Sequence, residues 1–311
     1  MNFPIAGVHI APAYLVTVGF VVGLLGGFFG VGGSFLAGPA LYAAGVPMNF
    51  VVGTDLAHIV GKSIVAARKH RTLGNIDIKL GAIMVLGTIT GVEGGAQVIQ
   101  WLKRAAHIDW VVGPTFIVIL IGIAGFMTWE AVKTFQQRRR SVGRTQIGRG
   151  GHPSQHDHSA LDFISRAVHR VSLPPHVHLP VSGIASVSIW AILLVSFVGG
   201  FFSGFLGGGA GYIRLPCLIY LLGIPTHIAV GTDLFEIIIS AGYGTVTHAL
   251  KGNVDILIAL VMHTGAALGA QIGATLTQYF VGPRIRAAFI PLPLIGAALM
   301  LHGLLTGHGV K

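Results

Sequence analysis

Ionisable side chains recur at one helical spacing in a chain that is otherwise apolar. Asp55, His58 and Lys62 are spaced i, i+3 and i+7, so a helix would carry all three on one face. A second triplet with the same spacing follows later in the chain: Asp233, Glu236 and Ser240. Charged groups at membrane depth cost on the order of 2.5 kcal/mol or more each unless they are paired or hydrated. We therefore predict a polar seam in which Lys62 binds an anion, while His58 and the three carboxylates form ion pairs or exchange protons.

The alternative for part of this pattern is ordinary helix capping. Thr54 precedes Asp55 as an N-cap residue would, and the helix dipole favours an acidic residue in the first turn. Thr232 stands in the same relation to Asp233. The residue pattern leaves both interpretations open, and the predicted anion site includes the two threonines.

Two glycine clusters, GGFFGVGG and GFLGGGAG, each follow an apolar helix. The outer glycines fall at helical spacing and suit close helix packing. The inner glycines are too dense for a helix interior, where each costs roughly 1 kcal/mol relative to Ala. We predict an unwound tip at the inner positions: Gly30, Gly32, Gly33, Gly207, Gly208, Gly209 and Gly211.

A half-helix that starts after such a tip points free backbone N–H groups at the membrane centre, where they can hold an anion. Arg214, just beyond the second tip, would add a fixed cation or would extend to a membrane interface. The predicted substrate ligands are Lys62, Arg214, Gly32, Gly33, Gly208, Gly209, Thr54 and Thr232.

The elements that hold these residues must cross a membrane. The chain has 311 residues, of which 53% are hydrophobic and 10% charged, and its mean hydropathy is +0.77. Apolar stretches long enough to span run near 13–30, 77–100, 111–135, 186–206, 255–280 and 287–306, with further spans near 54–69 and 232–249. The first stretch lacks a basic segment before it, so we expect an uncleaved first span.

The chain contains one unit twice. The stretch VGTDL occurs at Val52–Leu56 and again at Val230–Leu234, and in the same register GNIDI meets GNVDI. Upstream, the glycine clusters align after the register is shifted by a single position. Each copy crosses the membrane an odd number of times, so the second copy must be inverted. The predicted fold is all-α and integral to the membrane, with two inverted-topology repeats, each a glycine-broken or re-entrant helix pair plus three transmembrane helices.

The distribution of Lys and Arg predicts the orientation. Most of these residues fall on the side that holds the segment between the copies, which is therefore expected to be cytoplasmic, with both termini periplasmic. The predicted units are a first membrane repeat at 1–135, a His- and Arg-rich cytoplasmic linker at 136–184, and a second repeat at 185–311. The expected partners are the lipid bilayer and a small anion, with no nucleic acid; a homodimer is left open.

Catalytic and metal chemistry find little support. The linker histidines His152, His156 and His158 lack Cys partners and a regular ligand spacing, and Cys217 is the only cysteine. Ser203 lies in the second glycine cluster, but no spacing places a histidine beside it. We expect no catalytic residue, no metal site and no cofactor.

The order of glycine-rich broken helix, Gly-x-Pro turn, VGTDL, basic or His-bearing loop (RKHRTLGNID, THALKGNVD) and glycine-lined helix resembles the TauE/SafE sulfite exporter family. The resemblance covers nearly all of the chain except the linker. It implies a non-enzymatic secondary transporter of a small sulfur-containing or organic anion, such as sulfite, thiosulfate, sulfoacetate or a related sulfonate, in a bacterial inner membrane. Alternating access is expected and proton coupling is left open. The alternatives are a passive anion channel and, more remotely, a metal-handling or enzymatic membrane protein.

Overall fold

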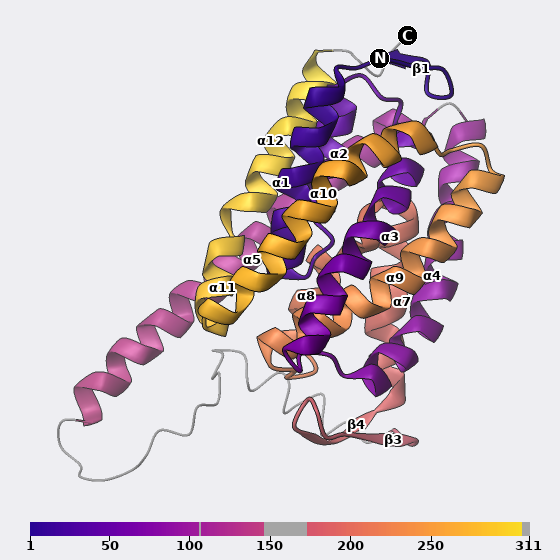
Figure 1. The fold of residues 1–311 in the computed structure, drawn as a ribbon. Helices are drawn as coiled ribbons and strands as arrows, with labels where there is room; N and C mark the ends of the chain where they lie inside the picture. Colours follow the sequence, from indigo (N-terminus) through magenta and orange to yellow (C-terminus); the bar gives the residue numbers. More distant parts are fainter. Residues whose placement is uncertain (106, 146–172, 307–311) are drawn as a thin grey trace.

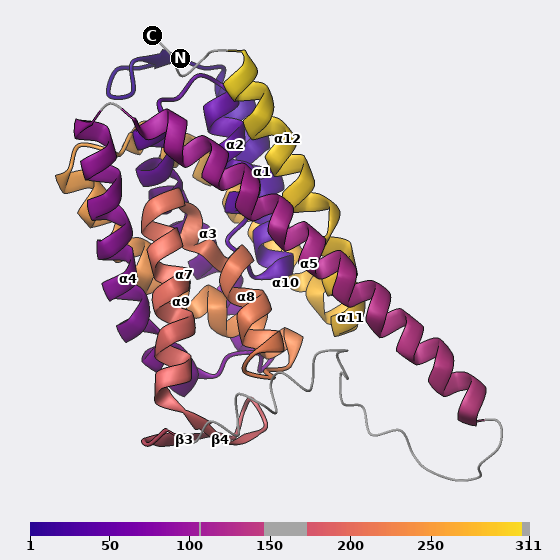
Figure 2. The ribbon, with the colours of Figure 1, turned by 180° about the vertical axis from the view of Figure 1, so that it is seen from behind.

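The computed structural model describes residues 1–105, 107–145 and 173–306. Two short antiparallel hairpins accompany a bundle of helices (Figure 1). The hairpins are β1 (Asn2–Phe3) with β2 (Val8–His9), and β3 (His176–Leu179) with β4 (Ile184–Ser188). They lie at opposite ends of the bundle (Figures 1 and 2). The end with β1–β2 and the C-terminal end of α12 is called the terminal face, and the end with β3–β4 the linker face.

The first half of the bundle contains a broken helix pair followed by three long helices. Its elements are α1 (Pro12–Phe29), α2 (Ser34–Ala43), α3 (Met48–Thr72), α4 (Ile78–Arg104) and α5 (Ile108–Thr145). The second half follows the same order, except that it has two additional 3₁₀ turns and that two helices stand where the first half has α5. Its elements are α7 (Ile189–Leu206), the 3₁₀ turn η1 (Gly208–Ala210), α8 (Gly211–Tyr220), α9 (Thr226–Leu250), α10 (Ile256–Leu276), η2 (Thr277–Tyr279), α11 (Gly282–Phe289) and α12 (Pro291–Leu305).

Seven helical stretches of the described residues are long and apolar enough to cross a membrane. They are Pro12–Phe29, Met48–Thr72, Ile78–Arg104, Ile108–Lys133, Ile189–Leu206, Ile256–Tyr279 and Arg284–Leu305. Helix α9 is as long as α3, with 25 residues, but it is not among the seven because its polar residues lower its hydropathy. Its buried polar face places it inside the bundle.

The two short helices occupy opposite halves of the membrane depth. Helices α2 and α8 have ten residues each, or about 15 Å, whereas a hydrocarbon core is about 30 Å thick. Figures 1 and 2 show α2 in the half nearer the terminal face and α8 in the half nearer the linker face. Both start at the middle of the bundle, directly after the glycine clusters.

Glycines let the two halves interlock. Helix α1 packs on α10, and α4 packs on α7. A Cβ on Gly23 of α1 would lie 2.3 Å from the carbonyl oxygen of Ala266, and one on Gly204 of α7 would lie 2.1 Å from that of Val92. The expectation that the outer glycines permit close packing is confirmed. Since the partners are backbone atoms, no rotamer change could relieve a larger residue.

Two predicted helix starts were wrong. Helix α3 begins at Met48 and α9 at Thr226, so Thr54 and Thr232 lie inside helices and do not cap them. Within the predicted linker, α5 continues to Thr145 and the hairpin β3–β4 is folded, with Leu179 fully buried. The linker histidines His152, His156 and His158 lie outside the described residues.

Candidate functional site

The helices of each half break at the middle of the bundle, where the glycine backbone turns left-handed. Gly30, Gly32 and Gly33 have φ between 68° and 74°, and Gly207, Gly208 and Gly209 have φ between 75° and 85°. L-residues avoid this region because their Cβ clashes with the backbone. The predicted unwound tips are therefore present at these positions. Gly211 differs, because its φ of −57° is helical and it opens α8.

Each tip inserts against the repeated pentapeptide of the other half. A Cβ on Gly30 would lie 2.6 Å from Cα of Val230, and one on Gly207 would lie 3.0 Å from Cα of Val52. The tips also meet each other, since a Cβ on Gly32 would lie 3.1 Å from the carbonyl oxygen of Gly208. The backbone at the bundle centre is thus packed too closely for side chains.

The remaining residues of the pentapeptide hold the opposite half by matching contacts. Gly53 lies against the backbone of Asn253, and Gly231 lies against that of Asn75, each with 2.2 Å between the would-be Cβ and the carbonyl oxygen. The Thr54 hydroxyl accepts a hydrogen bond from the Asp255 backbone N–H at 2.9 Å. The recurrence of VGTDL therefore has a structural cause, because each copy packs against and hydrogen-bonds the turn of the other half, GNID or GNVD.

A further matched pair was not recognised from the sequence. His70 Nε2 bonds the carbonyl oxygen of Gly27 at 3.1 Å, and His248 Nε2 bonds that of Gly204 at 3.0 Å. Both histidines are fully buried. They satisfy carbonyl groups near the ends of α1 and α7, just before the helices break. The two histidines align in the register that superimposes the VGTDL copies, and this was the signal that could have identified them.

Arg214 of α8 joins two carboxylates of α9 inside the bundle. Its Nε bonds Asp233 Oδ1, and its Nη2 lies 2.5 Å from Glu236 Oε2. All three side chains are fully buried. Its remaining bonds, both at 3.3 Å, reach Thr88 Oγ1 on α4 and the carbonyl oxygen of Gly209 in the tip. The predicted alternative, extension of Arg214 to a membrane interface, is wrong.

The two carboxylates that contact Arg214 can carry more negative charge than its guanidinium compensates. Two acidic side chains share one arginine, which leaves one negative charge uncompensated within this triad if both are ionised. Asp233 Oδ2 and Glu236 Oε1 have no hydrogen-bond partner in the described part of the chain, while Ser240 donates to Glu236 Oε2 at 3.3 Å. Because buried uncompensated charge is costly, this triad is suited to accept a proton.

Helix α3 carries a buried basic group. Lys62 is 2% exposed, and its Nζ has no hydrogen-bond partner among the residues described. Asp55 interacts with Lys62 electrostatically, and Asp55 Oδ1 lies 3.5 Å from His58 Nδ1. His263 of α10 fills the space beside Gly61, next to Lys62 on α3. An ammonium kept in such a place without a hydrogen bond is a candidate anion ligand.

Tyr212 adds a donor that sequence reasoning missed. It is fully buried on α8, two residues before Arg214, and it interacts electrostatically with Asp55. Its hydroxyl lacks a hydrogen-bond partner within the described ranges. An apolar neighbourhood, with Phe116 at 6.1 Å between ring centroids, surrounds the ring. Nothing in the sequence around Tyr212, which lies in a helix that contains glycine and proline, marked it as a hydrogen-bond donor of the site.

The comparison with known protein families decides the identity of this bundle. Residues 15–300 match the family model described as "Sulfite exporter TauE/SafE". The chain belongs to the TauE/SafE family. A relative from Bacillus subtilis (strain 168), "Probable membrane transporter protein YunE", is 25% identical over 299 residues, covering 93% of this chain and 97% of the relative.

Two other similar proteins span distant organisms. "Probable membrane transporter protein MJ0441" of Methanocaldococcus jannaschii is 24% identical over 280 residues, which is 85% of each chain. "Sulfite exporter TauE/SafE family protein 6" of Arabidopsis thaliana is 26% identical over 111 residues, or 34% of this chain and 26% of the relative. No solved structure matches the chain. The protein is thus a multi-pass membrane protein of a transporter family.

Within this TauE/SafE protein, the predicted site residues fall into four groups. Arg214, Asp233 and Glu236 form the triad, and Asp55, His58 and Lys62 lie together on α3. The hydroxyls of Thr54 and Thr232 accept backbone hydrogen bonds from the opposite half, so their role as ligands stays a prediction. Gly32, Gly33, Gly208 and Gly209 form the tips; their role as anion ligands also stays a prediction.

Proposed function

We propose that this protein is a secondary transporter that moves a small sulfur-containing or organic anion across the bacterial cytoplasmic membrane by alternating access. Sulfite, thiosulfate, sulfoacetate and related sulfonates are the substrate class. The buried Lys62 ammonium, whose Nζ has no hydrogen-bond partner in the described chain, carries the proposal. An anion that reaches Lys62 would compensate its charge and supply the missing acceptor.

The paired contacts between the halves support an inverted-repeat mechanism. The two halves share the order of a broken helix pair followed by long helices, and matching residues make matching contacts, as with His70 and His248. Helices α2 and α8 lie on opposite sides of the centre (Figures 1 and 2). Two such units can rock about their shared tips and expose the centre to one face at a time.

The triad supports proton coupling. Arg214 already bonds Asp233 and Glu236, so we assign it to holding the carboxylates and assign anion contact to Lys62 and the Tyr212 hydroxyl. Protonation of one carboxylate would remove the charge that repels an incoming anion. A proton and an anion would then enter the centre together.

A transport assay with a panel of anions tests the proposal. Purified protein would be reconstituted into proteoliposomes, and uptake of sulfite, thiosulfate, sulfate, sulfoacetate, taurine or acetate would be measured into empty vesicles. Exchange would be measured with vesicles that already contain the same anion. Saturable uptake with exchange of a sulfur oxyanion or sulfonate is the expected result. Flux that does not saturate and shows no exchange would instead establish a passive channel, and failure of every anion would reject anion transport.

A further inference from the structure

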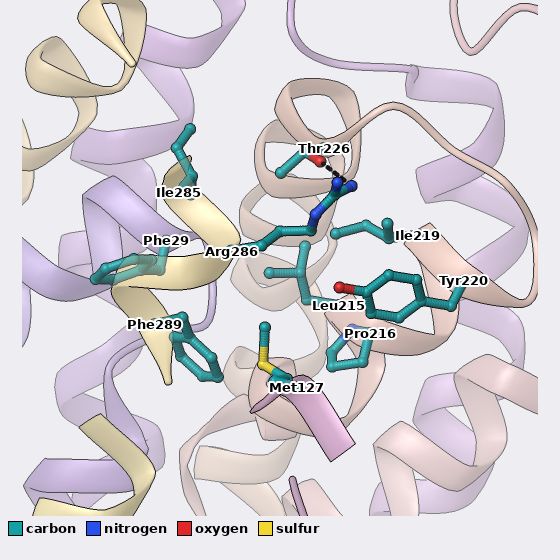
Figure 3. A pocket seen from close by; sticks show the side chains of 10 residues that line it. All are labelled: Phe29, Met127, Leu215, Pro216, Ile219, Tyr220, Thr226, Ile285, Arg286 and Phe289. Carbon is teal, nitrogen blue, oxygen red and sulfur yellow. Dashed lines mark hydrogen bonds between the residues drawn. The ribbon is translucent and has the colours of Figure 1, made fainter. Parts of the chain in front are cut away.

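A small pocket lies between the bundle centre and the linker face. Its walls come from the ends of α1 and α11, the C-terminal half of α8, the start of α9, and Met127 of α5 (Figure 3). Two of its lining residues adjoin the central site in sequence: Phe29 precedes Gly30 of the first tip, and Leu215 follows Arg214. The pocket therefore lies next to residues of the proposed transport site.

The cationic group of this pocket is Arg286. It is 4% exposed, its Nη1 donates to Thr226 Oγ1 at 3.3 Å, and its guanidinium lies 5.8 Å from the centroid of the Tyr220 ring (Figure 3). Thr226 is the first residue of α9. Glu130 is the nearby acid; its Oε2 accepts the Tyr220 hydroxyl hydrogen bond at 3.0 Å, and it is not among the residues that line the pocket.

The equivalent position at the terminal face carries the opposite charge. In the register that aligns the two glycine clusters, Asp109 in the first turn of α5 corresponds to Arg286, and Pro114 corresponds to Pro291. Asp109 interacts with the backbone of Met48, the first residue of α3, and electrostatically with Tyr42. An acid thus contacts the start of α3, whereas a base contacts the start of α9.

The aromatic residues confirm that the two places correspond. The Tyr42 ring packs against α12, because a Cβ on Gly303 of that helix would lie 2.7 Å from the ring. Tyr220 packs on Phe126 of α5 with 5.5 Å between the ring centroids. Phe126 corresponds to Gly303 in the same register of the glycine clusters. The two places therefore share one arrangement, and the residue at the corresponding position, Asp109 or Arg286, differs in the sign of its charge.

We infer that Arg286 forms a loading site for the anion at the linker face, and that Asp109 disfavours the anion at the matching place on the terminal face. The inference rests on the proposed anion transport. A positive charge at one mouth and a negative charge at the other raises the local anion concentration at the first and lowers it at the second. The charges leave the equilibrium distribution of the anion unchanged, so they act on the KM measured from each face.

Orientation-resolved transport gives the first test, with sulfoacetate and thiosulfate as probes. Arg286→Gln should raise the KM from the linker face about fivefold, which corresponds to about 1 kcal/mol of binding free energy. It should leave the KM from the terminal face unchanged. Asp109→Asn should lower the KM from the terminal face only. Arg284→Gln, which removes an exposed arginine of the same helix, is the matched control and should change neither value.

Charge-selective labelling gives a second test that needs no transport. Cysteines at Pro225 and Pro47, which precede Thr226 and Met48, would be introduced singly into a Cys217→Ser protein. The rate ratio of an anionic to a cationic methanethiosulfonate reagent reports the local potential. The ratio should be higher at Pro225→Cys than at Pro47→Cys, Arg286→Gln should lower it at the former, and Asp109→Asn should raise it at the latter.

The outcomes separate this inference from the proposed function. Equal ratios at the two cysteines, or KM changes of the same size at both faces, would overturn the loading site even if transport is robust. If no flux is seen but the labelling ratios are as expected, the proposed transport is rejected. The opposite electrostatic potentials near Arg286 and Asp109 then still stand. Since Arg286 is buried, each variant is first checked for a monodisperse profile; Asp109→Asn, at a half-buried position, tests the inference if Arg286→Gln does not fold.

Discussion

The hydroxyl of Thr54 accepts a hydrogen bond from the backbone N–H of Asp255 in the other half of the chain, and Thr232 accepts the matching bond from Asp77. Both bonds are 2.9 Å long, and all four residues are buried. Asp77 and Asp255 in turn cap α4 and α10. Each half therefore fixes the start of a long helix in the other, and neither half can be complete alone.

Replacing either threonine by valine should destabilise the protein to a similar extent. The change keeps the shape of the side chain but leaves a buried backbone N–H without its acceptor, at a cost of about 1–3 kcal/mol. Unfolding in detergent, followed by circular dichroism, measures the loss. Thr90→Val is the control, because Thr90 bonds only carbonyl groups of its own helix at an exposed position. A loss no larger than that of Thr90→Val would contradict this contact between the halves.

Alanine at a tip glycine should prevent the two halves from closing on each other. At Gly30, φ is 74° and the new Cβ would lie 2.6 Å from Cα of Val230, so the left-handed backbone and the overlap act together. About 1–2 kcal/mol is expected from the backbone and about 1–3 kcal/mol from overpacking. Gly122→Ala, which meets nothing within 4 Å, is the control. Yield and thermal stability in detergent are the measurements, and a Gly30→Ala protein as stable as the control would refute the tight packing of the tips.

Neutralising Glu236 should uncouple transport from the proton gradient. Glu236→Gln keeps an oxygen for Arg214 and Ser240 but removes the excess negative charge of the triad. Uptake of the panel anions by the variant should no longer respond to a pH difference across the liposome membrane, while exchange of anion for anion continues. Glu93→Gln, at a partly exposed carboxylate of α4, should keep the response. A normal response of Glu236→Gln would place proton coupling elsewhere.

The sequence predicted more of the architecture than of the local contacts, for identifiable reasons. The glycine tips could be predicted because several adjacent glycines are incompatible with a helix. The start of α3 was missed because Pro47 is a helix N-cap without a capping side chain, while Thr54 offered a better cap pattern. Pairing of Arg214 with Asp233 and Glu236 depends on how α8 packs on α9, which spacing along the chain does not reveal.

The two hairpins are also repeated, but their sequence match is too short to have been recognised. Leu179, Pro180 and Gly183 of the second hairpin region correspond to Phe3, Pro4 and Gly7 of the first. Both hairpin regions carry a left-handed glycine, and Phe3 and Leu179 are buried. Few residues match, and the polar stretch before them resembles a linker, so only the fold makes the correspondence plain. Ser182 then bonds Asp77, as Ala6 bonds Asp255.

Cysteine labelling should place the linker face in the cytoplasm. Val181 on the β3–β4 turn is 47% exposed and Ile5 on the β1–β2 turn is 51% exposed, so both are accessible positions for a cysteine in a Cys217→Ser protein. The excess of Lys and Arg near the linker face predicts that an impermeant thiol reagent reacts with Ile5→Cys in intact cells, and with Val181→Cys only after lysis. The reverse pattern would invert the proposed topology.

Removing the Lys62 ammonium should abolish or severely weaken anion binding without unfolding the protein. Lys62 is buried on α3, and its Nζ makes no hydrogen bond within the described residues. Its nearby opposite charge is Asp55, with which it interacts electrostatically. An anion that binds there gives the ammonium a charge-assisted contact, so Lys62→Ala should reduce affinity at least tenfold, which corresponds to about 1.4 kcal/mol.

A purely structural role for Lys62 makes different predictions. A buried ion pair between Lys62 and Glu236 is the structural alternative, but Glu236 bonds Arg214, so Lys62→Ala with Glu236→Ala should not restore activity. Arg68→Ala, an exposed cation on the same helix, should bind the panel anions normally. Binding is measured by calorimetry on monodisperse protein in detergent. A stable Lys62→Ala protein with unchanged affinity would remove Lys62 from the site, and rescue by the double variant would establish a structural pair, because breaking one partner of a buried pair costs more than removing both.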